Sequence, residues 1–363
     1  MSLQPDVLRA RAEQFCAAVA RFLQDTPERA SYFARCEVFH PELLDTSLEC
    51  SLRPWTDPAR LVAAALDDLG PERPEVELIP PLVAHVVLAG VVPASHVQAM
   101  AYPWLLGAHV RVKAPSMDPH FPALFAAALG ARVEPVTGRG TSGDAVVVVG
   151  GDGAVAAVRA HASGGAPVLA FGDRISVAWL GDCAEVDWAG LALDVGLYDQ
   201  RGCLSVVEVL VAPGHAESSA ASLGHALDQL PRRRLGDDED GIRRARDLWV
   251  LEGRRCLRYR DATLFVVAGG TVEAGPLGRT VVVREVVSPL GALETLRGRL
   301  GTVVVAPGAR PPLGELGRLG ASRVVLPGHA QAAGPEWPHD GVSPFGGLCR
   351  RLWRHPHQAD SRA

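Results

Sequence analysis

One cysteine lies where a nucleophile would be useful. Cys203 follows a glycine in the segment Asp199-Gln200-Arg201-Gly202-Cys203-Leu204-Ser205, between a helical stretch and a strongly apolar strand. At such a junction the thiol is accessible, and nearby backbone N–H groups can stabilise a thiolate and later an oxyanion. Most cysteines outside disulfides are instead small buried hydrophobic residues. The local context leaves both interpretations open, and the other six cysteines, which lie in helical or strand patterns, are weaker candidates.

Lys113 is a second candidate because it is unusual in this chain. Of the 36 basic residues it is the only lysine, and the sequence contains no asparagine. Such a bias replaces lysine by arginine wherever the chemistry tolerates it, so a retained lysine can mark a task that the planar guanidinium cannot perform. Lys113 ends an apolar strand, where a compact cation suits a ribose hydroxyl or a phosphate. The alternative is a solvated charge at a strand end.

A glycine-rich turn is a third candidate. Gly150-Gly151-Asp152-Gly153 follows the apolar run Ala145–Val149 and opens a helical pattern. Such a turn lets backbone approach a pyrophosphate at the positive end of the helix. The turn lacks the full dinucleotide-binding fingerprint, Asp152 would repel a phosphate if it pointed inward, and many such turns only cap a helix.

Other common site patterns are absent from the sequence. No CxxC, HxxxH or HExxH spacing occurs, so we expect no metal site. Neither a GxSxG elbow nor a phosphate-binding P-loop motif is present.

The elements that would position these candidates alternate along the chain. The first 80 residues read as mainly helical. From position 86 onward, apolar strands alternate with amphipathic helices, which is typical of parallel sheets covered on both faces. We therefore expect an α/β protein with a doubly wound nucleotide-binding domain and a second α/β block. The expected strands of the first block are 86–90, 109–114, 131–135, 144–149 and 167–171, and those of the second are 204–211, 262–268, 280–287, 301–306 and 322–326.

Composition narrows the class of protein. The chain has 363 residues, 48% hydrophobic and 21% charged, with a net charge of −5. This charge argues against a nucleic-acid partner or a polybasic membrane anchor. No apolar run reaches the roughly 18 residues of a membrane span, and the first residues are too charged for a signal peptide. Scattered cysteines fit a reducing compartment, so we expect a cytoplasmic protein.

Taken in order, segments from position 86 to 352 resemble the LuxC-type long-chain acyl-CoA reductases, a branch of the aldehyde dehydrogenase superfamily. The similar segments are Ala89-Gly90-Val91-Val92-Pro93, Leu105-Leu106-Gly107, Val112–Pro119, Phe171–Ser176, Asp199–Ser205, and the tail Arg323…Gly328…Gln331…Trp337…His339-Asp340-Gly341. The most specific is the segment around Cys203, which resembles the nucleophile segment of that family.

The resemblance implies a reaction and a set of roles. Cys203 would attack an acyl-CoA thioester, CoA would leave, and hydride from a reduced nicotinamide would release an aldehyde. Lys113 would bind the adenosine ribose. Ser116 stands where many NAD-using relatives carry a glutamate, which favours NADPH. Gly150, Gly151 and Asp152 would lie near the pyrophosphate, with Gly172 also in the cofactor site.

Two departures from the family pattern leave alternatives open. Val91 replaces an asparagine that donates to the oxyanion, and Phe171 stands before Gly172 where a base (Glu or His) would be expected. The first alternative is a non-catalytic or weakly active relative that binds acyl-CoA or a nucleotide within a multi-enzyme complex. The second is an oxidative aldehyde dehydrogenase. The resemblance leaves room for a homo-oligomer, or for a partner enzyme that supplies or consumes the acyl group.

The expected domain bounds follow from these assignments. Residues 1–80 form a helical segment, residues 81–198 with 327–363 the nucleotide-binding domain, and residues 199–326 the catalytic α/β domain.

Overall fold

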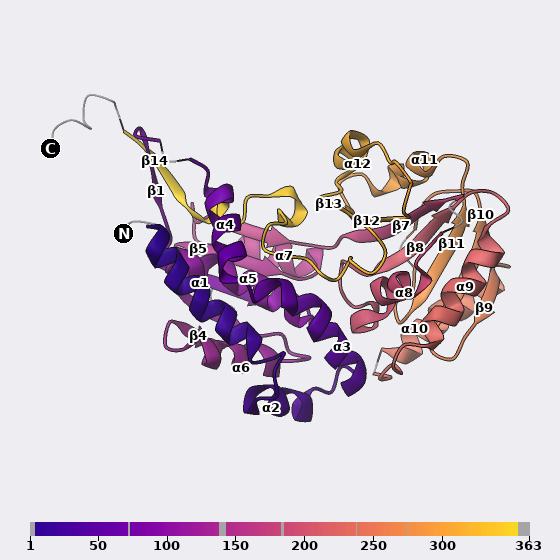
Figure 1. Ribbon diagram of the computed structural model, residues 1–363, viewed down its shortest axis with the longest axis horizontal. Helices are drawn as coiled ribbons and strands as arrows, with labels where there is room; N and C mark the ends of the chain where they lie inside the picture. The colour runs from indigo at the N-terminus through magenta and orange to yellow at the C-terminus, as the bar shows by residue number, and fades with distance from the viewer. Residues whose placement is uncertain are drawn as a thin grey trace. The chain divides into compact units, whose positions relative to one another are not determined.

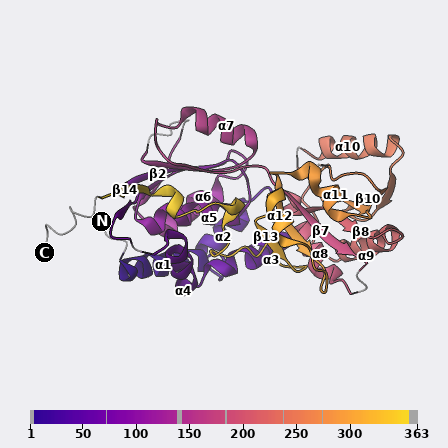
Figure 2. The ribbon, with the colours of Figure 1, turned by 90° about the horizontal axis from the view of Figure 1, so that it is seen from above.

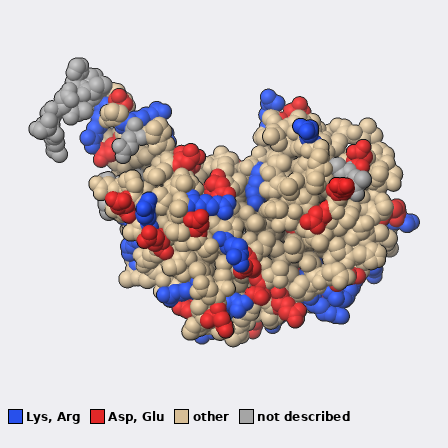
Figure 3. Space-filling model, in the orientation of Figure 1, with Lys and Arg blue, Asp and Glu red and all other residues tan. Residues whose placement is uncertain are grey.

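The computed structural model describes residues 4–71, 73–137, 143–182, 185–236, 238–273 and 275–354. The chain forms two compact units (Figure 1). Unit 1 comprises residues 1–36, 52–172 and 334–363, and unit 2 comprises residues 37–51 and 173–333. None of the described helices has the length and apolar character needed to cross a membrane. On the face shown in Figure 3, acidic and basic side chains are intermixed.

Unit 1 is built on a five-stranded parallel sheet with the strand order β4-β3-β2-β5-β6. Its strands are β2 (Val83–Leu88), β3 (His109–Lys113), β4 (Val133–Pro135), β5 (Ala145–Val149) and β6 (Val168–Phe171). Helices α5 (Pro93–Leu106) and α6 (His120–Leu129) cover one face, and α7 (Asp152–His161) covers the other (Figure 2). This is the doubly wound order expected from the sequence, with its switch point between β2 and β5.

Helices from the N-terminal segment complete unit 1. Helix α1 (Pro5–Ala20) packs on α5 and α6, and Phe15 meets Phe125 of α6 edge to face at 5.4 Å. The other elements of this unit are α2 (Pro27–Arg35), α4 (Pro58–Leu69), and an antiparallel pair of strands, β1 (Val76–Ile79) and β14 (Arg350–Trp353). The N-terminal helices therefore extend the core of the five-stranded sheet.

Unit 2 is built on a seven-stranded sheet with the order β13-β12-β7-β8-β11-β10-β9, parallel except for β9. Its strands are β7 (Ile175–Gly181), β8 (Val206–Val211), β9 (Arg255–Arg258), β10 (Thr263–Ala268), β11 (Thr280–Glu285), β12 (Leu300–Val305) and β13 (Arg323–Val325). Its helices are α3 (Pro41–Leu52, of which residues 41–51 belong to this unit), α8 (Trp188–Gly196), α9 (Ala216–Asp228), α10 (Glu239–Leu251), α11 (Pro289–Leu293) and α12 (Leu313–Leu319).

Two apolar layers hold this second sheet. One packs α8 and α9 against the strands through residues such as Leu191 and Leu223, and the other packs α11 and α12 through Leu293 and Leu316. Helix α10 covers the same face as α11, with Trp249 edge-on to Phe265 of β10 at 5.0 Å. The alternating, almost fully apolar strands explain this double-sided burial.

The bounds of the compact units differ from the domain bounds expected from the sequence. Strand β7, which the sequence analysis missed, lies between β12 and β8, so the second unit begins near 173 instead of 199. Residues 37–51 belong to unit 2, while residues 1–36 and the other N-terminal helices belong to unit 1.

Candidate functional site

The segment before Cys203 has an unusual backbone. Tyr198, Asp199 and Gln200 are three consecutive non-glycine residues in the left-handed region, with φ of 54°, 50° and 65°. Left-handed backbone costs a residue with a Cβ about 1–2 kcal/mol, and such residues persist only where surrounding contacts fix them. The segment that leads to Cys203 is therefore held by interactions outside itself.

Tyr198 is anchored to helix α3. Its backbone N–H donates to Ser47 Oγ at 3.2 Å, and its hydroxyl lies 2.7 Å from Ser51 Oγ. Its ring is buried and meets Phe39 edge to face at 5.4 Å. These contacts explain why residues 37–51 belong to unit 2, although they lie far from it in sequence.

Gln200 is anchored to the sheet by its amide. Its Nε2 donates to the carbonyl oxygens of Val206 at 3.0 Å and Thr280 at 2.9 Å, and its Oε1 accepts from Thr280 N–H at 3.0 Å. The side chain thus joins the starts of β8 and β11, and all three bonds are buried.

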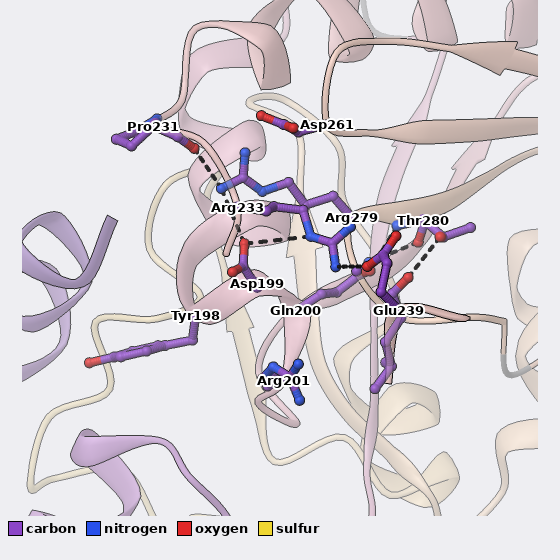
Figure 4. Close-up of polar contacts among 12 residues, drawn as sticks. Tyr198, Asp199, Gln200, Arg201, Pro231, Arg233, Glu239, Asp261, Arg279 and Thr280 are labelled. Atoms are coloured by element: carbon purple, nitrogen blue, oxygen red, sulfur yellow. Dashed lines mark hydrogen bonds and ion pairs between the residues drawn. The ribbon is translucent and has the colours of Figure 1, made fainter. Parts of the chain in front are cut away.

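Asp199 lies in a cluster of buried charges (Figure 4). Its carboxylate is 3.3 Å from Arg279 and 3.9 Å from Arg233. Arg279 also donates to the carbonyl oxygen of Pro231 at 2.8 Å, and Arg233 donates to Glu239 at 2.9 Å. Burial raises the pKa of Asp199, while the positive charges of Arg279 and Arg233 oppose that rise.

Cys203 itself is half-buried and lies just before β8. Its carbonyl oxygen accepts from Ser176 Oγ of β7 at 2.7 Å, and Ser176 Oγ in turn accepts from Thr302 N–H of β12 at 3.1 Å. Two residues later, Ser205 Oγ accepts from Gln331 Nε2 at 3.1 Å. The segment around Cys203 is thus hydrogen-bonded to the sheet at Gln200 and Cys203, and to Gln331 at Ser205.

Gln331 belongs to a loop, residues 327–333, that is fixed by Asp194 of α8. The carboxylate of Asp194 accepts from the N–H groups of Gly328 and Ala330 at 2.7 and 2.8 Å. Burial raises the pKa of Asp194 to about 7. The hydrogen bonds from the two N–H groups lower this pKa, but by less than burial raises it. The loop lies tightly on α8, since a Cβ on Gly190 would come within 2.9 Å of Gly328 N.

In unit 1, the predicted cofactor residues all follow the carboxyl ends of neighbouring strands. Gly150, Gly151 and Asp152 follow β5 and begin α7, and Gly172 follows β6. A Cβ on Gly150 would lie 2.5 Å from the Cβ of Ala89, and one on Gly172 would lie 2.5 Å from Asp152 Oδ1. Gly150 is required by its contact with Ala89, whereas a Cβ on Gly172 would only displace the flexible Asp152 carboxylate, and a glycine turn at a helix start is the arrangement that binds pyrophosphates.

Lys113 and Ser116 lie at the end of β3. Lys113 is half-buried, and across the described ranges no group pairs with its ammonium or accepts a hydrogen bond from it. Ser116 is exposed. The loop that carries them is held by Asp118, which accepts from Tyr32 at 2.8 Å and from His120 N–H at 3.1 Å. An unpaired cation on a fixed loop suits an anionic or hydroxylated ligand.

Both departures from the family pattern are buried. Val91 follows β2 and is 7% exposed. Phe171, at 2% exposure, is stacked on the imidazole of His339 with ring centroids 4.0 Å apart and planes 10° apart. Asp340 lies beside His339 in a tight turn with left-handed backbone. A histidine from the C-terminal segment thus covers the ring that stands where a base was expected.

The structure therefore brings six positions to one edge of a single sheet, while Cys203 lies in unit 2; the six are Lys113, Ser116, Gly150, Gly151, Asp152 and Gly172. The residues that hold the segment around Cys203, above all Arg279 and Gln331, were not predicted from the sequence. Their signal was weak, because each lies more than 75 residues from its partner. Within the described part of the chain, no group of three or more His, Cys, Asp or Glu side chains could hold a metal ion.

Comparison with known proteins extends these findings. A search of curated proteins finds no match to the chain. Among solved structures, an oxidoreductase from Marinobacter aquaeolei superposes with a TM-score of 0.75 at 11% identity, covering 96% of this chain and 85% of that one. Succinic semialdehyde dehydrogenase from Streptococcus pyogenes, in complex with NADP+, gives 0.70 at 12% identity, covering 96% and 90%. NADP-dependent glyceraldehyde-3-phosphate dehydrogenase from Bacillus halodurans gives 0.67 at 15% identity, covering 95% and 86%.

These structures show that the fold is that of the aldehyde dehydrogenases, as expected from the sequence. The family model for acyl-CoA reductase (LuxC) matches residues 140–351, more than half of the chain and including Cys203. The expected family is thereby confirmed: the chain belongs to the acyl-CoA reductase (LuxC) family, and it is an oxidoreductase.

Proposed function

We propose that the protein reduces the acyl group of a fatty acyl-CoA to an aldehyde, with NADPH as reductant and Cys203 as the acyl-accepting nucleophile. The observation that carries the proposal is the strained and anchored segment 198–205, which lies within the region matched by the acyl-CoA reductase family and presents one half-buried thiol. Strain of this kind is concentrated at functional sites.

The first half-reaction follows from the chemistry of the thiol. The Cys203 thiolate attacks the thioester carbonyl, a new carbon–sulfur bond forms, and the bond to the CoA sulfur breaks, so that CoA leaves as a thiolate and takes up a proton. The Cys203 N–H is the proposed oxyanion donor, because Val91 offers no side-chain donor. Thiolates are both good nucleophiles and good leaving groups, so the same residue serves both half-reactions.

The residues of unit 1 fit a dinucleotide. The backbone of Gly150 and Gly151, at the start of α7, is the proposed pyrophosphate contact. Lys113 and Ser116 are the proposed ribose contacts. Asp152 and Gly172 lie at the same edge of the sheet. When bound, the reduced nicotinamide supplies the hydride that converts the Cys203 thioester to an aldehyde and regenerates the thiolate. Ser116 has no charge to repel a 2′-phosphate, and Lys113 adds a cation, so we propose NADPH over NADH.

The test is intact-protein mass spectrometry after mixing the protein with a panel of acyl-CoAs in the absence of NADPH. One acyl mass should add at Cys203, and Cys203→Ser should abolish both this adduct and aldehyde formation. Full reductase activity in Cys203→Ala would refute the mechanism.

The buried Val91 and Phe171 favour a second candidate, an acyl-CoA-binding or nucleotide-binding relative with little activity. That candidate predicts that acyl-CoA binds without forming an adduct. The same spectra therefore separate the two functions.

A further inference from the structure

Two charged side chains behind the nucleophile have no part in the proposed chemistry. Asp199 and Arg279 are 2% and 0% exposed, and their charged groups are 3.3 Å apart. Arg279, like Asp199, has left-handed backbone, with φ of 60°. Both members of a buried ion pair thus adopt a backbone that is costly for residues with a Cβ.

We propose that the Asp199–Arg279 pair is a positioning device, which holds residues 198–200 in the left-handed conformation and so fixes the backbone at Gly202 and Cys203. The inference rests on the proposed function, in which Cys203 accepts the acyl group. Asp199 lies four residues before Cys203, and the side chain of its neighbour Gln200 is hydrogen-bonded to Thr280, which follows Arg279 in the chain. The Asp199–Arg279 ion pair and the Gln200 amide therefore both hold residues 198–200 to the start of β11 (Figure 4).

A second buried pair in unit 2 shows that burial alone is not the explanation. Glu208 of β8 and Arg284 of β11 are also almost fully buried and in contact, but both lie in regular strands with ordinary backbone. Buried ion pairs are often no more stabilising than apolar residues of similar size. A pair that costs backbone strain at both ends is better explained by the geometry that it imposes.

The surroundings of Asp199 determine what its substitution would change. Arg233 and Arg279 face the carboxylate, Glu239 pairs with Arg233, and Arg201 pairs with Asp238 nearby. Asparagine tolerates left-handed backbone about as well as aspartate. Asp199→Asn therefore removes the charge without changing the size or the backbone preference of the residue.

The test compares four variants of the full-length protein with the wild type: Asp199→Asn, Arg279→Met, the double variant, and Glu208→Gln as the matched control. The control is matched because each arginine keeps other partners when its acidic partner is replaced. In Glu208→Gln, Arg284 keeps Glu273 and the Gly269 carbonyl oxygen, and in Asp199→Asn, Arg279 keeps the Pro231 carbonyl oxygen. Turnover number, KM for the acyl-CoA, melting temperature, and hydrogen exchange of the peptide covering residues 197–205 are measured for each.

We expect Asp199→Asn and Arg279→Met each to lower the turnover number at least tenfold, with KM changed less than threefold. The turnover number of the double variant should be no lower than that of the more impaired single variant, because both substitutions remove the same ion pair. Exchange in peptide 197–205 should rise in these variants and remain as in the wild type in Glu208→Gln, whose turnover should stay within twofold.

The inference is overturned if Asp199→Asn and Arg279→Met keep their turnover, or if Glu208→Gln loses as much turnover as they do. It is also overturned if the losses appear in KM alone. Failure of the proposed function gives a different result, since Cys203→Ala would then remain active whatever the Asp199 variants do. Should Asp199→Asn not fold, Arg279→Met and its exchange pattern decide the question.

Discussion

The segment around the proposed nucleophile Cys203 in unit 2 and the edge of unit 1 that carries the proposed cofactor residues are organised in opposite ways. Residues 198–205 are fixed by added contacts, in which buried polar side chains from several elements hold a strained backbone. The edge of unit 1 that carries the proposed cofactor residues depends on missing side chains, since Ala89 and the Asp152 carboxylate already occupy the space that a Cβ on Gly150 or Gly172 would need, and Lys113 is left unpaired among the described groups. A covalent nucleophile needs a fixed thiol, whereas a bound dinucleotide needs open backbone and unused donors.

Gln200→Ala tests the first half of this comparison and should have the largest effect. It removes three buried hydrogen bonds and leaves the Thr280 N–H and two carbonyl oxygens without their partner. Each unsatisfied buried group costs about 1–3 kcal/mol. The melting temperature should fall markedly and the turnover number should drop about a hundredfold or more. Affinity of the folded fraction for NADPH, measured by fluorescence titration, should stay within threefold, and a tenfold loss would contradict the comparison.

Gly150→Ala is the converse experiment on the cofactor edge. The added Cβ would meet that of Ala89 at 2.5 Å, and because both are fixed by adjacent strands the backbone of the turn must shift. We expect NADPH to bind at least tenfold more weakly. Acylation of Cys203 by acyl-CoA in the absence of NADPH should proceed at its wild-type rate. Gly153→Ala is the control, because nothing lies within 4 Å of a Cβ at that position.

Lys113→Met should have a smaller effect on the same edge. The substitution removes the unpaired ammonium but keeps the length and apolar stem of the side chain. A charge-assisted hydrogen bond contributes roughly 1–3 kcal/mol, so NADPH affinity should fall about tenfold, at 1.4 kcal/mol per decade. The loss should be larger for NADPH than for NADH if the 2′-phosphate is the partner. An equal loss would leave Lys113 as a ribose contact and remove the argument for NADPH from this residue.

The two regions also differ in how far the sequence predicts them. Alternating apolar strands predicted all five strands of the first sheet, three of them to within a residue at each end, whereas β2 lies two to three residues earlier than expected and β4 begins two residues later. The glycine turn after β5 and Lys113 at the end of β3 lie where that pattern placed them. The missed strand β7 contains Ser176 and Trp179 in a short run after a charged turn, so its apolar signal was diluted. The anchors of the nucleophile could not be read locally, because the contacts Asp199–Arg279, Gln200–Thr280 and Ser205–Gln331 span 80 to 126 residues. Chain topology, which side-chain periodicity does not encode, brings them together.

The smallest expected effect concerns the loop that carries Gln331. Burial raises the pKa of Asp194 to about 7, so the folded protein holds this proton more tightly than the unfolded chain, in which the pKa is near 3.8. The free energy of unfolding should therefore fall as pH rises from about 4 to about 7 and level off above that. Between pH 5 and 8 the free energy of unfolding should fall by about 3 kcal/mol through Asp194, since about two pH units of this range lie below its folded pKa at 1.36 kcal/mol each.

Asp194→Asn cannot titrate, so it should remove this part of the pH dependence in urea unfolding curves recorded at each pH. Burial also raises the pKa of Glu208 to about 7. Its contribution to the pH dependence of the unfolding free energy should therefore remain in the variant, with the same sign. The asparagine keeps one carbonyl oxygen for the two N–H groups of Gly328 and Ala330, so its stability at pH 5 should be lower than that of the wild type. An unchanged slope in the variant would mean that Asp194 stays ionised in the folded protein, held by its two amide donors. The Gln331 loop would then be fixed by a charged carboxylate, as the segment before Cys203 is by the ion pairs of Asp199, and both loops of unit 2 would depend on a buried negative charge.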